Sequence, residues 1–176
     1  MIKIFICRKG ENDMGKKLDA VRNKSKEGSD SFRDTKNLSQ KAVCDVKQMK
    51  GLIDSLPTDV DDEILTASET VKEGTKSDAE GYMNSEVKSN LESGKKQMDE
   101  STKAANEQIK NNEAVKATFA KMDSVGSFGK NARGEGARQI DSLTNQFSSE
   151  IGKNEAAIQE ANSSFQKDLS DISSTF

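Results

Sequence analysis

The sequence contains no histidine and no tryptophan, and only one proline and one tyrosine among its 176 residues. Histidine is the commonest general base, so its absence removes Ser-His and Cys-His nucleophile pairs and imidazole metal ligands. A β-sandwich or barrel needs many turns and aromatic strands, which this composition does not supply. These absences count against the common hydrolytic enzymes and against an all-β fold.

The chain is also poor in apolar residues, which make up 32% of it. Globular domains have roughly 45–50% when glycine is included, and the 12 glycines here do not close that gap. Such a chain cannot fill a thick core, but it can fill the narrow seam of a long helical bundle. Disorder is the alternative, because low hydropathy with many Ser, Lys and Glu residues is typical of disordered chains. Sustained helical periodicity favours the bundle.

The two cysteines, Cys7 and Cys44, have neither the spacing of metal ligands nor a disulfide framework, so free thiols are expected. Net charge is −3, which does not suggest nucleic-acid binding. Residues 1–50 nevertheless hold 13 Lys/Arg against 7 Asp/Glu. This surplus is interpreted as a solvated helix face; the alternative is a basic end that touches an acidic partner or anionic lipid.

Residues 137–176 carry the clearest amphipathic pattern of the chain. Apolar residues recur at steps of three and four or small multiples of them, and Asn154 and Ala161 fill the two gaps. This spacing places one apolar stripe along one side of a helix. Because the stripe is bulky, part of it is expected to bind a partner, through Ile140, Leu143, Phe147, Ile151, Ile158, Phe165, Leu169 and Ile172.

A first helix is expected over residues 14–56, with Gly28 as a candidate break and Pro57 as its end. Residues 1–13 do not match this pattern and are expected to be a non-native or disordered leader. Lys9-Gly10-Glu11 can be encoded by a ribosome-binding sequence, and Met14 follows at a plausible spacing for a start. The apolar run at the N-terminus is too short to span a membrane.

A long second helix is expected over residues 58–123, with Thr58 as its N-cap and acidic residues in its first turn. If this helix is interrupted, the interruption is expected at 74–81, where two glycines flank a polar span. Residues 124–136 are predicted to be a Gly-rich loop that precedes the helix over 137–176. The predicted fold is therefore all-α, an elongated antiparallel, coiled-coil-like bundle or hairpin of about three long helices.

No catalytic residue, cofactor site or metal site is predicted. The carboxylates lie on polar helix faces beside lysines, whereas catalysis needs convergent groups in a concave, partly desolvated pocket. The prediction is a non-enzymatic protein without a transmembrane segment.

Two short motifs match an export signal that consists of an aromatic residue, three residues of any type and an acid. They are Tyr82–Glu86 and Phe119–Asp123. With these motifs, the polar, histidine-free helical chain resembles the small helical proteins of bacterial type VII secretion, namely the Trp-x-Gly family and the helical partners of Leu-x-Gly toxins. The chain has neither a Trp-x-Gly nor a Leu-x-Gly sequence. The resemblance implies pairing with a secreted partner through helix faces.

Two functions are therefore expected as alternatives. In the first, the protein is a partner, chaperone or targeting factor for a secreted, toxin-like protein, in a hetero-complex with another helical protein or as a homo-oligomer. In the second, it is a structural or stress-related amphipathic protein that folds on oligomerisation or on a membrane surface. The expected location is the cytoplasm, with export without a cleaved signal peptide as a further option.

Overall fold

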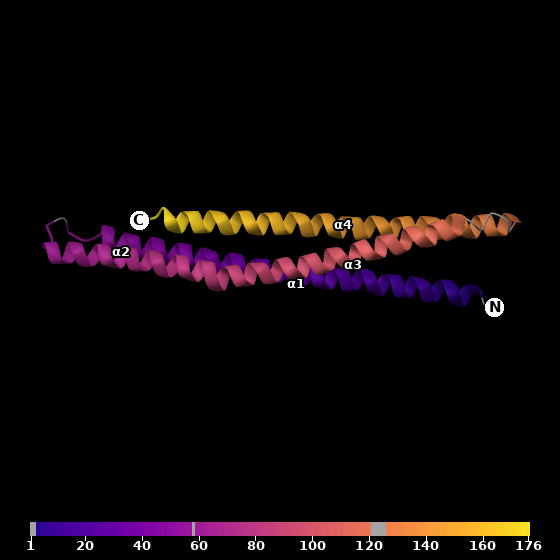
Figure 1. Cartoon of the computed structure of the whole chain (residues 1–176), viewed down its shortest axis with the longest axis horizontal. Coiled ribbons are helices and arrows are strands. Elements are labelled where there is room, and N and C mark those ends of the chain that lie inside the picture. Colours follow the sequence, from indigo (N-terminus) through magenta and orange to yellow (C-terminus); the bar gives the residue numbers. More distant parts are fainter. Residues whose placement is uncertain (1–2, 58, 121–125) are drawn as a thin grey trace. The chain divides into compact units, whose positions relative to one another are not determined.

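The protein forms a helical bundle, as the sequence predicts, in a computed structural model that describes residues 3–57, 59–120 and 126–176. Figure 1 shows its helices, and no residue in these ranges belongs to a strand. The elements are α1 (Lys3–Asp54), α2 (Asp62–Tyr82), the π-helical segment η1 (Met83–Val87), α3 (Lys88–Ala120) and α4 (Gly126–Ser173). Since α2, η1 and α3 follow one another without a gap, the described residues make three helical runs, and the all-α prediction is confirmed.

Helix α1 is longer than the predicted 14–56. It begins at Lys3, so the backbone of residues 3–13 is helical where a non-native or disordered leader was expected. This helix counts against disorder, while a natural start at Met14 stays a prediction. It also passes through Gly28 without the break that was considered. Gly28 lies on the buried face, and packing along that face outweighs the roughly 1 kcal/mol that a helical glycine costs relative to alanine. At the other end, α1 stops at Asp54, three residues before Pro57.

The second run begins at Asp62 rather than at residue 58. Asp61 occupies the N-cap position, and its carbonyl oxygen accepts the first backbone hydrogen bond, from the N–H of Ile64 at 2.9 Å. Thr58, the predicted N-cap, lies outside the described residues. Asp62 and Glu63 stand in the first turn, where carboxylates complement the helix dipole.

A break at 74–81, which the sequence left open, does not occur, because this span is regular α-helix within α2. The irregularity follows it, at η1, where the N–H of Lys88 donates to the carbonyl oxygen of Met83, five residues back. The buried residues Met83, Val87 and Leu91 are spaced four and four. In a regular α-helix each step of four drifts by about 40° around the axis. The wider π turn reduces that drift and keeps the three side chains on one face.

Helix α4 begins at Gly126, so the Gly-rich loop predicted over 124–136 is wrong for residues 126–136. Among its residues with described side chains, Gly136 packs against another helix: a Cβ built there would stand 3.5 Å from the Phe119 ring. Helix α4 therefore already contacts α3 at this point. Glycine content alone overstated the tendency of the segment to form a loop.

The chain divides into two compact units, each built from helices that also contribute to the other. Unit 1 comprises α1 up to Glu27 together with Lys96–Ala156. Its core contains buried Leu18, Val21, Ala105 and Phe147, with Ile109, Leu143 and Ile151 partly buried against them. Residues from α1, α3 and α4 therefore share one apolar seam.

Polar layers interrupt the seam of unit 1. Asn154 of α4 is fully buried; its Oδ1 accepts a hydrogen bond from Ser25 Oγ at 2.6 Å, and its Nδ2 donates to Ser101 Oγ at 3.0 Å. Ser101 Oγ in turn donates to the backbone carbonyl of Val21 at 2.9 Å. A second layer joins α3 to α4 through the Asn112 Nδ2, which donates to Thr144 Oγ1 at 3.1 Å. Buried polar groups that find partners in only one alignment select that alignment of the helices.

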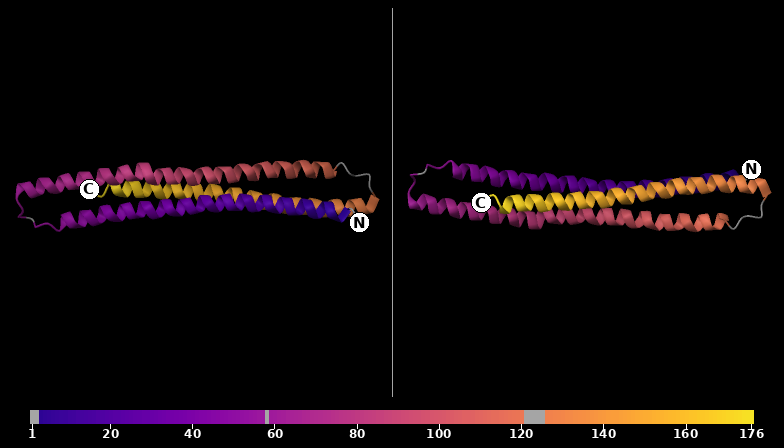
Figure 2. Two further views of the ribbon diagram at one scale, coloured as in Figure 1. Left: turned by 90° about the horizontal axis from the view of Figure 1, so that it is seen from below. Right: turned by 90° about the horizontal axis from the view of Figure 1, so that it is seen from above.

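Unit 2 comprises Gly28–Lys95 and Ala157–Phe176. The buried apolar residues of this unit are Phe32, Ala42, Val43, Val46, Met83, Val87, Leu91, Phe165 and Ile172. Figures 1 and 2 show the yellow C-terminal part of α4 lying beside the α1–α2 hairpin and ending well short of the connection between α1 and α2. The hairpin therefore extends past the last turn of α4 within this unit.

Candidate interaction site

The end of the α1–α2 hairpin exposes an apolar groove. It has a volume of about 280 Å³ and is lined by Leu52, Ile53, Leu56, Ile64, Ala67, Ser68 and Val71. We call these residues the hairpin groove. Leu52 keeps 66% of its surface exposed, and Ile64 and Val71 each keep 44%. Clustered exposed side chains of this size mark interaction surfaces more often than isolated ones do.

The groove lies along the part of the hairpin that α4 does not reach. The Ser173 hydroxyl in the last turn of α4 donates to Glu80 Oε1 at 2.7 Å, which fixes where α4 ends along α2. Asp62 precedes Glu80 by 18 residues, so about 27 Å of α2 extends beyond this contact. Helix α2 accordingly has no buried residue, although it carries Ile64, Leu65 and Val71.

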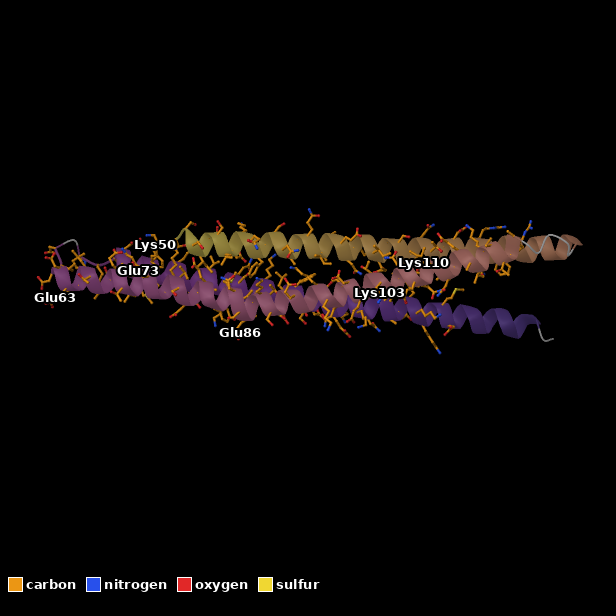
Figure 3. All side chains as sticks on the ribbon, viewed as in Figure 1. Lys50, Glu63, Glu73, Glu86, Lys103 and Lys110 are labelled. Atoms are coloured by element: carbon orange, nitrogen blue, oxygen red, sulfur yellow. The ribbon has the colours of Figure 1, made fainter. Side chains whose placement is uncertain are left out.

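Acidic residues surround the groove. Residues 50–73 hold two lysines and seven acids, for a net charge of −5. Both lysines already pair with an acid on their own helix, Lys50 with Asp54 at 2.8 Å and Lys72 with Glu69 at 2.5 Å. Figure 3 places Glu63 near the hairpin end of α2 and Glu73 further along the same helix. The apolar groove therefore lies in a negative local field.

A buried polar pair holds α4 in this position along α1. Ser39 Oγ donates a hydrogen bond to Asp168 Oδ2, and both side chains are buried. The same hydroxyl hydrogen is shared with the backbone carbonyl oxygen of Lys36, 3.1 Å from Ser39 Oγ. The described part of the chain contains no buried side-chain polar atom without a hydrogen-bond partner. The Ser39–Asp168 pair therefore satisfies a carboxylate that would be costly to bury alone.

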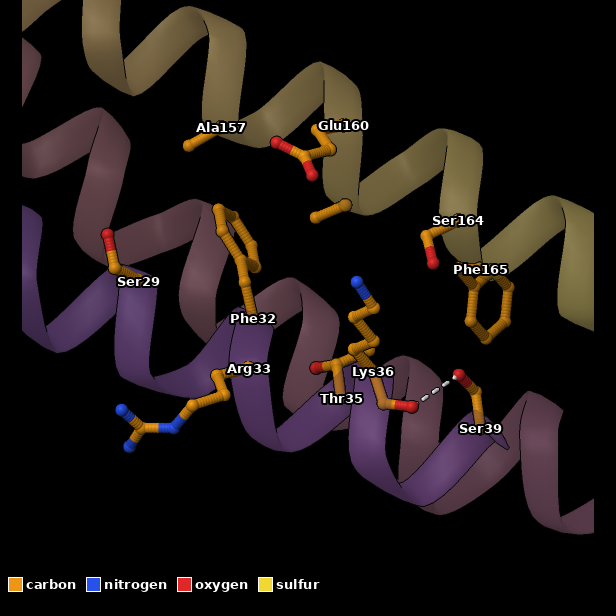
Figure 4. Close-up of a pocket in the computed structure, with 11 residues that line it drawn as sticks. Ser29, Phe32, Arg33, Thr35, Lys36, Ser39, Ala157, Glu160, Ser164 and Phe165 are labelled. Atoms are coloured by element: carbon orange, nitrogen blue, oxygen red, sulfur yellow. Dashed lines mark hydrogen bonds between the residues drawn. The ribbon is translucent and has the colours of Figure 1, made fainter. Parts of the chain in front are cut away.

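A second hollow of unit 2 lies between α1 and α4 and also measures about 280 Å³ (Figure 4). Phe32 and Phe165 line it together with Ala157 and Ala161, whose small side chains leave the space open. The polar groups around it are Ser29, Arg33, Thr35, Lys36, Ser39, Glu160 and Ser164. Figure 4 shows the Arg33 side chain extending away from α4 and from Glu160. Arg33 pairs with Asp30 of its own helix at 3.0 Å, so its charge is already matched on α1.

The structure places the predicted partner interface mostly against the chain itself. Ile140, Phe147, Phe165 and Ile172 are buried within their own units. Leu143, Ile151, Ile158 and Leu169 are half-buried. The stripe thus serves as internal core here, and its role toward a partner stays a prediction. The hairpin groove was not predicted, since none of its residues was among the expected interface residues.

The two export-motif matches differ in accessibility. Tyr82 and Glu86 are both exposed, one turn apart, and line a shallow surface depression with Asn37 and Ser93. Phe119 is half-buried against Gly136, and Asp123 lies outside the described residues. Of the two motifs, only Tyr82–Glu86 therefore has both of its defining side chains exposed.

Within the described residues, no cluster of three or more His, Cys, Asp or Glu side chains has a metal-binding arrangement. The helices of the same part of the chain include none that is long and apolar enough to cross a membrane. Comparisons with protein-family models, with curated proteins and with solved structures found no match.

Proposed function

We propose that the protein is a non-enzymatic helical interaction protein that binds another helical protein through the hairpin groove. In this proposal it acts as a partner, chaperone or targeting factor for a secreted, toxin-like protein. One observation carries the proposal: α2 presents a row of large apolar side chains and buries none of them. The absence of histidine from the sequence supports a non-enzymatic role.

A partner helix in the hairpin groove would complete a three-helix arrangement. In unit 2, Met83 and Val87 are completely buried where α4 accompanies the hairpin. The groove residues have the same helical spacing but lack the third helix. Burying them would gain about 25 cal/mol for each Å² of apolar surface removed from water. The exposed Tyr82–Glu86 pair would remain accessible for export recognition beside such a complex.

Co-expression with the products of neighbouring genes tests this function. Each pair is purified and analysed by size-exclusion chromatography with light scattering, and a complex of defined stoichiometry is expected with one of them. Combined Ile64→Ser and Val71→Ser substitutions should release that partner while helicity and the urea midpoint stay unchanged. Val115→Ser is the matched control, because Val115 is equally exposed in unit 1 but lies outside the groove. A complex that survives the double substitution, or no complex at all, contradicts the proposal.

A further inference from the structure

We propose that the hairpin groove receives a basic amphipathic helix, one with a Leu- or Ile-rich stripe flanked by Lys and Arg. This inference rests on the proposed function and specifies the chemistry of the partner. Three features of unit 2 support it: the shape of the groove, its length and its charge.

The shape favours a helix. The groove lies between α1 and α2, lined by Leu52 and Leu56 from one side and by Ile64 and Val71 from the other. Packing a third helix against two others places its apolar stripe in the groove between them.

The length of α2 that extends beyond α4 indicates how long the partner helix should be. About 27 Å of α2 lies beyond the Ser173–Glu80 contact, as the 18-residue separation of Asp62 from Glu80 indicates. A helix of about 18 residues spans this distance. That is five turns, enough for an apolar stripe to contact the whole groove.

The negative charge around the groove indicates which residues should flank the apolar stripe of the partner helix. Seven acids and two lysines lie between residues 50 and 73, and the two lysines are engaged in ion pairs on their own helices. Asp61, Asp62 and Glu63 stand together at the start of α2. Lys and Arg on a partner helix would complement this field, and their long aliphatic stems would extend the apolar contact.

A second copy of the chain is a poorer occupant. Two hairpins brought together would each contribute a charge of −5 to the same interface. The basic N-terminal part of α1, where its side chains are described, buries Leu18 and Val21 in the core of unit 1. It therefore has no free apolar stripe to place in the groove of a second copy. Electrostatic complementarity therefore favours a different protein.

Two synthetic peptides of about 18 residues test the proposal with the full chain. Both carry the same leucine stripe; one has lysines on the flanking positions and the other has glutamates. Binding is measured by fluorescence anisotropy at low and physiological salt. The lysine peptide should bind at least about tenfold more tightly, with an advantage that shrinks as salt rises. Asp62→Asn with Glu63→Gln should weaken its binding, whereas Glu155→Gln, an exposed acid of unit 1, should not.

The Ile64→Ser and Val71→Ser double variant separates the possible failures. Equal binding of both peptides, abolished by the double variant, would overturn the basic character but leave the groove as the interaction site. No peptide binding, with a neighbouring gene product still captured through the groove, would likewise overturn only this inference. Lysine-peptide binding that survives the double variant would overturn the groove as the site as well. A dimer by light scattering that the double variant dissolves would identify a second copy as the occupant and overturn the inference.

Discussion

Helix α2 and the segment that follows it, η1 with the first turns of α3, are consecutive parts of one helical run. Both carry large apolar residues at helical spacing: Ile64 and Val71 in the first, Met83 and Val87 in the second. The first pair stays 44% exposed and the second is completely buried. Helix α4 accompanies only the second part (Figure 1). Burial in this bundle is therefore decided by the presence of a third helix rather than by the pattern of the helix itself.

Hydrogen exchange should show the largest difference between the two parts. Amides of residues 62–76 are expected to exchange through local opening at a free energy of a few kcal/mol or less, because no core residue anchors them. Amides near Val87 and Leu91 should approach the global unfolding free energy, on the order of 5–15 kcal/mol. Native-state exchange followed by NMR measures both. Similar protection in the two parts would mean that α2 is stabilised without a third helix.

Truncation of a side chain should have the next largest effect. Met83→Ala removes a completely buried side chain, so the free energy of unfolding should fall by about 2–5 kcal/mol. Ile64→Ala, in the exposed part, should change it by only about 0.5 kcal/mol. Urea unfolding of both variants at one pH gives the comparison. A comparable loss at Ile64 would show that the groove is covered in solution by some part of the chain.

Two glycines give a matched pair with effects of opposite sign. A Cβ at Gly94 would stand 2.7 Å from the Phe32 ring, whereas nothing lies within 4 Å of a Cβ at Gly74. Gly94→Ala should therefore destabilise by about 1–3 kcal/mol, because Phe32 is buried and the ring must move. Gly74→Ala should stabilise by about 0.4–1 kcal/mol, since it adds helix propensity without a clash. Thermal unfolding measures the two shifts; shifts of the same sign would contradict the difference in packing.

The smallest effect is expected from an exposed ion pair of unit 1. The hydrogen bond and charge of Glu100, 2.5 Å away, raise the pKa of Lys24, while Lys24 lowers the pKa of Glu100 below its usual 4.5. The contribution of Glu100 to stability is present above pH 4.5 and is lost as pH falls through its lowered pKa. That of Lys24 is complete below its usual pKa of 10.5 and is lost as pH rises through its raised pKa.

NMR titration of Glu100 tests this pair directly. In the Lys24→Met variant the pKa of Glu100 should return toward 4.5, with little change in the urea midpoint at pH 7. An unchanged pKa would mean that the two side chains do not pair in solution. A large loss of stability would contradict the small contribution that is expected of an exposed ion pair.

The periodicity of apolar residues predicted the helical fold and most of the core. A helix with one buried face has apolar residues every three or four positions, and this spacing is visible in the sequence. Phe147 and Phe165 lie in the core, and Asn154 fills a gap in the stripe as a buried, fully bonded amide. Glycine positions misled the prediction of helix ends, since packing holds Gly28 and Gly136 in helices. The groove was missed for a different reason. The spacing of Ile64 and Val71 matches that of a covered seam, and only the tertiary structure shows that α4 does not reach them.

The Ser39–Asp168 pair acts as a positional stop for α4 within unit 2. An apolar seam alone permits sliding, because a shift of seven residues, about 10 Å, returns similar side chains to similar places. Such a shift would leave the Asp168 carboxylate buried without its partner. The same hydrogen bond that completes the core thereby sets where α4 ends beside α2, so the position of an exposed helix end is fixed at a buried site rather than at the surface itself.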